Sequence, residues 1–97
     1  MADSIEKRFG SAMENIYFRA KEETGYQASR YLQMVHERGG IETARFLLAQ
    51  PGVSDGFAVL WEKQRLDLTV EALVLEPEWQ GLFTEGEKAI AKRRLGK

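Results

Sequence analysis

The sequence predicts an all-α fold, a compact bundle of about six short helices in a single domain. Apolar residues recur at steps of three and four along the chain, and no segment shows the alternation of a half-buried strand. Glycine and proline divide the chain into short pieces. The 97 residues, 43% of them hydrophobic, suffice for one core. Because only the first piece is long, we expect crossed helices rather than a long up-and-down bundle.

The first helix is expected over residues 3–24, where Gly25 suits the left-handed position that follows a helix. Gly10 weakens the middle of this helix, because glycine costs about 1 kcal/mol there relative to alanine. We therefore expect residues 1–12 to be an N-terminal extension of the first helix, frayed or folded as a separate turn, and residues 13–97 to be the helical domain. The apolar stripe of the helix consists of Ile5, Phe9, Met13, Ile16, Tyr17 and Ala20.

Two further helices are expected over residues 27–38 and 41–50. The pair Gly39-Gly40 separates them, and Pro51 followed by glycine ends the second. Their inward residues are Ala28, Tyr31, Leu32 and Val35 in the first and Ile41, Ala44, Leu47 and Leu48 in the second.

The second half of the chain carries three N-terminal helix signals. Ser54 can cap a fourth helix that runs through Trp61, and Asp67 or Thr69 can cap a fifth that ends before Pro77. Thr84, with Glu87 three positions later, matches a capping box, which predicts the start of the last helix. Its inward residues are expected to be Ala89, Ile90 and Leu95.

Charge and composition limit the classes of partner and compartment. The formal net charge is -1, so no overall field attracts a polyanion or an acidic membrane. Because the chain has no cysteine, it can form neither disulfides nor thiolate metal sites. No apolar run reaches the roughly 20 residues that span a bilayer, and the acidic N-terminus does not match a signal peptide. We expect a cytoplasmic protein that does not bind membranes.

Most of the chain, from about Met13 to Leu95, resembles a family of short, uncharacterised bacterial helical proteins. The resemblance implies a helical fold and supplies no activity, cofactor or catalytic residue. It rests on the segments Ile16–Lys21, Gly25–Met34, Gly39–Ala44 and Pro51–Phe57, and most specifically on Leu60–Glu62 and Arg65–Leu75, followed by Pro77, Leu82–Thr84, Ala91 and Arg94-Leu95.

Residues suited to catalysis or metal binding are scarce. His36 is the only histidine, and general acid–base chemistry or a zinc site needs partners that the sequence does not place beside it. None of the serines lies in a nucleophile motif, and Ser54 is explained as a cap. We therefore expect no enzyme, no metal and no cofactor.

A basic cluster at the C-terminus suggests an alternative function. Its members Lys88, Lys92, Arg93 and Arg94 are candidate phosphate-binding residues, so a nucleic-acid-associated helical domain is the second hypothesis. The same charges also complement the dipole of a terminal helix, which needs no ligand. A helix-turn-helix reader is less well supported, because the third helix offers only Arg45 and Gln50 for contacts to DNA.

The aromatic residues suggest the first hypothesis, a protein-interaction or adaptor module. Trp61 and Trp79 are expected in the core, because a domain this small depends on its largest side chains. Phe18 and Phe46 are offset from the apolar stripes of their helices, which predicts exposure. We expect Tyr17, Phe18 and Phe46 to contact a protein partner or a second copy of the chain.

Overall fold

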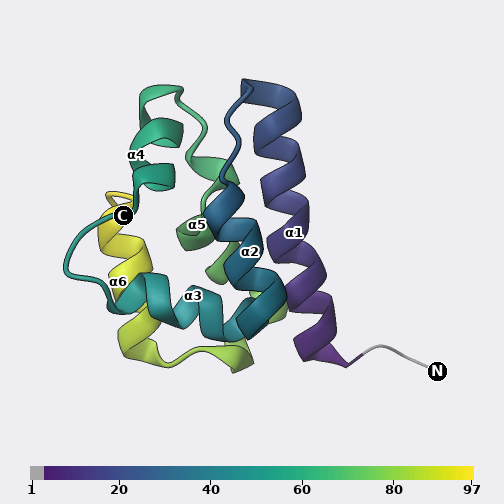
Figure 1. Cartoon of the computed structure of the whole chain (residues 1–97). Helices are drawn as coiled ribbons and strands as arrows, with labels where there is room; N and C mark the ends of the chain where they lie inside the picture. Colours follow the sequence, from purple (N-terminus) through teal and green to yellow (C-terminus); the bar gives the residue numbers. More distant parts are fainter. Residues whose placement is uncertain (1–3) are drawn as a thin grey trace.

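The computed structural model describes residues 4–97, and within them every regular element is a helix, which confirms the predicted all-α fold (Figure 1). Six are α-helices and two are short 3₁₀-helices. The α-helices are α1 (Ile5–Thr24), α2 (Ser29–Arg38), α3 (Gly40–Ala49), α4 (Asp55–Glu62), α5 (Val70–Val74) and α6 (Glu85–Arg94), and the 3₁₀-helices are η1 (Leu66–Leu68) and η2 (Pro77–Leu82).

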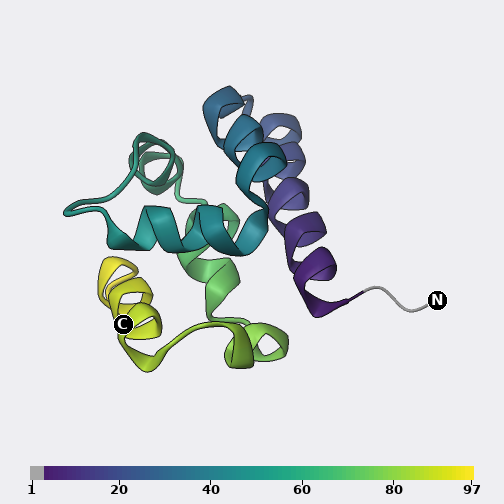
Figure 2. The ribbon, with the colours of Figure 1, turned by 60° about the horizontal axis from the view of Figure 1, so that its bottom comes forward.

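The long helix α1 forms one side of the molecule, and α2 runs back antiparallel beside it. Helix α3 crosses the lower half of both, and α6 packs against α3 and α5 on the other side (Figure 2). Helix α4 makes its main contacts with η1 rather than with α2. The molecule is therefore closely packed where α3, α5 and α6 meet, whereas α2 and α4 have few direct contacts with each other.

Helix α1 is continuous from Ile5, so the expectation of a frayed or separate segment before Met13 is wrong for the described residues; positions 1–3 lie outside them. Ser4 caps the helix by accepting from Lys7 N at 3.2 Å. Phe9 and Met13 have no exposed surface. The ring of Phe9 lies edge-on to the rings of Trp79 and Phe83, with centroids 5.3 Å apart in each pair. The burial of Phe9 and Met13 offsets the cost of Gly10 to the stability of α1.

A glycine at the start of α3 allows a close helix crossing. Gly10 faces Gly40, the first residue of α3, and a Cβ atom added to Gly40 would lie 2.7 Å from the Gly10 Cα. No real Cβ tolerates such a distance to a backbone atom, so the crossing requires glycine at position 40.

Most of the predicted caps are confirmed. Ser54 accepts from Phe57 N at 3.1 Å, and Thr84 and Glu87 form both hydrogen bonds of the capping box. Gly25 ends α1 in the left-handed conformation, with φ of 79°. Thr69 rather than Asp67 caps α5.

Most buried apolar residues form a main core between α1, α2, α3, α5, α6 and η2, and a small second cluster consists of Ala20, Leu60 and Leu68. Trp79 lies in the main core as predicted. Trp61 is 62% exposed, so its predicted core position is wrong. Because Phe57 and Leu60 define the buried side of α4, the residue after Leu60 points about 100° away. In α6, Ala91 is buried and Ala89 is exposed, which also differs from the expected stripe.

Candidate binding groove

The three aromatic residues expected on one exposed face lie in different environments. Phe18 is 50% exposed and Phe46 is 39% exposed, as their offset positions predict. Tyr17 is buried, as its position in the inward stripe of α1 predicts, so it offers little surface to a partner. Its ring lies edge-on to that of Phe18, with centroids 5.1 Å apart. The guanidinium of Arg38 covers the Phe46 ring at 4.7 Å from its centroid.

A groove of about 1020 Å³ opens between α2 and α4. It exists because α4 packs mainly on η1 and leaves the facing side of α2 uncovered. Met34 on α2, Phe46 on α3 and Val53 in the loop before α4 line its more accessible parts. Its buried apolar lining consists of Ile16, Tyr17, Ala20, Phe57, Leu60, Leu68 and Val70.

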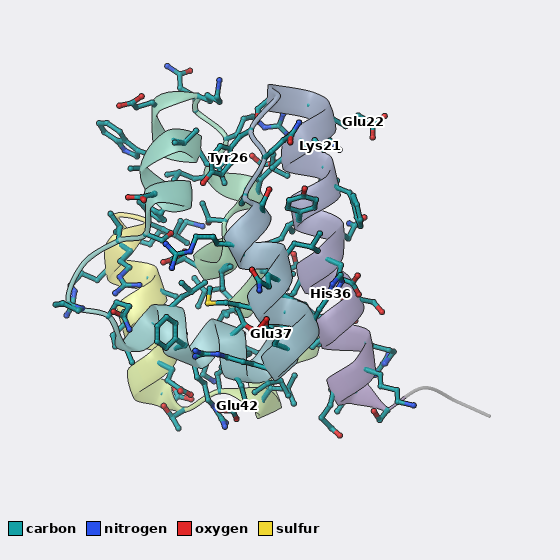
Figure 3. All side chains as sticks on the ribbon, viewed as in Figure 1. Lys21, Glu22, Tyr26, His36, Glu37 and Glu42 are labelled. Carbon is teal, nitrogen blue, oxygen red and sulfur yellow. The ribbon has the colours of Figure 1, made fainter. Side chains whose placement is uncertain are left out.

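Tyr26 lies between the start of α2 and α4 and narrows the groove at that end (Figure 3). The ring and hydroxyl of Tyr26 lie against Gly56 in the first turn of α4, where an added Cβ would meet them at 3.5 Å. Burial, together with the nearby Asp55 carboxylate, raises the pKa of Tyr26, so this hydroxyl is a weaker acid than an ordinary tyrosine. Two aromatic side chains from different elements thus line the groove, Tyr26 beside the first turn of α4 and Phe46 on α3.

The groove also contains a buried carboxylate. Glu71 of α5 lines the groove, and its Oε2 accepts a hydrogen bond from Arg94 Nη1 at 3.1 Å. The side chains of Glu71 and Arg94 are 4% and 9% exposed. Arg94 also donates to the carbonyl oxygens of Leu47, Leu48 and Gln50, at the end of α3. Sequence analysis missed Glu71, whose only signal is a charged residue beside the apolar stripe of a very short helix.

The predicted phosphate-binding cluster does not form one surface patch. Arg94 is buried, and the amine of Lys88 donates to the carbonyl and side-chain oxygens of Gln80 and pairs with Glu85 at 2.9 Å. Lys92 and Arg93 remain exposed. Two of the four basic residues therefore have roles within the fold, although sequence analysis grouped them with the others.

The histidine of the chain does not line the groove, although other titratable side chains, among them Glu37 and Asp55, do. His36 lies on the side of α2 that faces α1, where its Nε2 is 3.0 Å from Glu14 Oε2, and both side chains are exposed to solvent (Figure 3). Across residues 4–97, no three His, Cys, Asp or Glu side chains lie close enough together to hold a metal ion. Over the same residues, no helix is both long and apolar enough to cross a membrane.

Comparison of the chain with protein-family models, with curated proteins and with solved structures finds no match. The function must therefore be inferred from the geometry of the groove.

Proposed function

We propose that this chain is a small helical protein-interaction module without catalytic activity, and that its binding site is the groove between α2 and α4. The observation that supports this proposal is the volume of about 1020 Å³ with a largely apolar buried lining. Binding clefts typically combine an apolar lining with a few placed polar groups. The apolar face of a partner segment fits such a site, in the way that amphipathic helices enter grooves between helices.

Two exposed apolar side chains at the groove support a protein as the partner. Phe46 and Val53 are 39% and 47% exposed, and both belong to the groove lining. Covering large apolar side chains at the centre of an interface provides most of its binding energy. Phe18, although half exposed, does not belong to that lining and is expected to contribute little to binding there.

The titratable groups of the groove favour binding over catalysis. Glu71 is paired with Arg94, and Tyr26 holds its proton more tightly than usual. The groove lining, as residues 4–97 define it, includes no histidine. General acid–base catalysis needs a group that exchanges protons near neutral pH beside a reacting atom.

The cytoplasm of a bacterium is the setting that we propose. The absence of cysteine and the resemblance to short bacterial proteins support it.

The test compares two exposed phenylalanines, one in the groove and one outside it. Partners are captured from cells of the source organism with wild-type protein, with Phe46→Ser and with the matched control Phe18→Ser. The captured partner is then titrated at low and high salt. We expect Phe46→Ser to weaken binding about tenfold or more, Phe18→Ser to leave it nearly unchanged, and high salt to have little effect because the contact is apolar.

Several outcomes would contradict the proposal. If Phe18→Ser abolishes binding and Phe46→Ser does not, the outer face of α1 is the binding surface. Light scattering shows whether the partner is a second copy. Tight nucleic-acid binding in gel shifts that falls steeply with salt, and that is lost in Lys92→Gln/Arg93→Gln, would support the nucleic-acid hypothesis instead.

A further inference from the structure

The buried carboxylate in the groove has fewer hydrogen bonds than its charge requires. Arg94 provides one donor to Glu71, at Oε2, and directs further donors to three backbone carbonyls, at 3.1 Å (Leu47), 3.4 Å (Leu48) and 2.8 Å (Gln50). A carboxylate offers about four acceptor positions. A buried ion pair is favourable only when further hydrogen bonds satisfy the remaining positions.

The second oxygen of this carboxylate, Oε1, receives no hydrogen bond from residues 4–97. Within the described residues, the fully buried polar side-chain atoms that lack a hydrogen-bond partner do not include Oε1, so this oxygen keeps some contact with solvent. Since Glu71 lines the groove, we conclude that Oε1 is accessible from it. Nearby hydroxyls of the lining have other acceptors, because Tyr31 donates to Met13 O at 2.7 Å and Thr69 donates to Leu66 O at 2.7 Å.

The formal charges of the groove balance, so a positive group is favoured by the unpaired Oε1 itself. Glu71 pairs with Arg94, and the lining also contains two arginines, Arg30 and Arg38, and two further carboxylates, Glu37 and Asp55. The carbonyl oxygens that Arg94 contacts belong to the C-terminal end of α3 or follow it, and a helix C-terminus carries roughly half a negative charge. A protonated amine or guanidinium on an apolar stem matches this arrangement, because the stem can lie along the apolar lining while the head reaches the carboxylate.

We infer that the groove receives a protein segment that places one lysine or arginine, flanked by apolar residues, against Oε1 of Glu71. This inference rests on the proposed function, since it names the chemistry of the partner. Apolar neighbours would cover the rim at Phe46 and Val53, and the basic residue would fix the register of the segment in the groove.

The experiment uses the full chain and displayed random peptides of roughly 15 residues, enough for four helical turns. Peptides that bind wild-type protein are selected after removal of those that also bind Phe46→Glu, so that groove binders remain. We expect the selected peptides to share one basic residue between apolar residues. Replacing that residue in a synthetic peptide, arginine by citrulline or lysine by norleucine, should weaken binding about tenfold to a hundredfold.

The same peptides are then measured on Glu71→Gln and on the control Glu37→Gln, which changes an exposed carboxylate of the groove edge. Glu71→Gln should weaken the charged peptide and leave the neutral one unchanged, and Glu37→Gln should change neither by more than about twofold. Neutral peptides that bind wild-type protein within twofold of the charged ones would overturn the inference and leave the groove as a binding site. That comparison needs no variant, so it holds even if Glu71→Gln fails to fold. Selection that yields no Phe46-dependent peptide would reject both the groove and the inference.

Discussion

Because of the way α1 and α3 cross, we expect replacement of glycine by alanine to change the free energy of unfolding in opposite directions at positions 10 and 40, which face each other. In Gly40→Ala the new Cβ would lie 2.7 Å from the Cα and 3.0 Å from the N of Gly10, and 3.2 Å from Met13 Cγ. The first two are backbone atoms, so the helices must separate to relieve the clash. In Gly10→Ala the new Cβ meets only Gly40 N, at 3.9 Å, which is an ordinary contact.

The expected magnitudes follow from these distances. Forcing a methyl group into a closely packed contact costs about 1–3 kcal/mol, and Gly40 gains little helix propensity because it is the first residue of α3. Gly10 lies in the interior of α1, where alanine is favoured over glycine by about 0.5–1 kcal/mol. We therefore expect Gly40→Ala to lower the free energy of unfolding by about 1–3 kcal/mol and Gly10→Ala to raise it by up to about 1 kcal/mol.

Urea denaturation followed by far-ultraviolet circular dichroism measures both changes against wild type. A domain of this length typically has a stability of roughly 5–15 kcal/mol, so both effects are resolvable. Wild-type stability in Gly40→Ala would mean that the two backbones do not approach as closely as the structure shows. A loss above about 1 kcal/mol in Gly10→Ala would contradict the ordinary 3.9 Å contact between the added Cβ and Gly40 N.

Two other predictions concern the tryptophans and acid stability. Trp61→Ala should change the free energy of unfolding by less than about 0.5 kcal/mol and Trp79→Ala should lower it by about 3–5 kcal/mol, measured by urea denaturation; similar losses for both would contradict their different burial. The Arg65 guanidinium holds the pKa of Glu23 and of Asp67 below their ordinary values of 4.5 and 3.8. Both carboxylates therefore stabilise the fold above about pH 4.5, and this contribution is lost as the pH falls through their lowered pKa values. The stability difference between wild type and Arg65→Met should be largest near pH 7 and shrink on acidification, whereas a difference that grows in acid would refute this assignment.

The helix boundaries were predictable because they depend on local interactions. Ser54 and Thr84 bond to backbone groups three residues away, and Gly25 needs only its own left-handed backbone conformation. Such signals are readable without knowledge of the rest of the fold. Gly40 shows the limit of this reasoning. Its role in separating two helices is a local signal, whereas the approach of the Gly10 backbone, which leaves no room for a Cβ at position 40, depends on a different helix.

The core positions of the aromatic residues were less predictable. The apolar face of the short helix α4 can be formed by Phe57 and Leu60 or by Leu60 and Trp61. Packing on η1 selects the first pair. Trp79 lies in the 3₁₀-helix η2, which begins at Pro77 and has no α-helical periodicity, so its burial depends on its contact with Phe9. Size alone predicted burial of both tryptophans and was correct for one.

The polar centre of the groove is a purely tertiary feature, because Glu71 and Arg94 are 23 positions apart and belong to different helices. In the sequence, Arg94 is one of several basic residues that suit the end of α6, and its burial appears only when α6 packs against α3. Its hydrogen bonds to Leu47 O and Gln50 O hold the end of α3 and the start of the loop that lines the groove. The same arginine thus anchors the C-terminal helix and positions the carboxylate of the groove. Contacts within the fold thus explain Lys88 and Arg94 of the basic C-terminus, whereas Lys92 and Arg93 remain exposed.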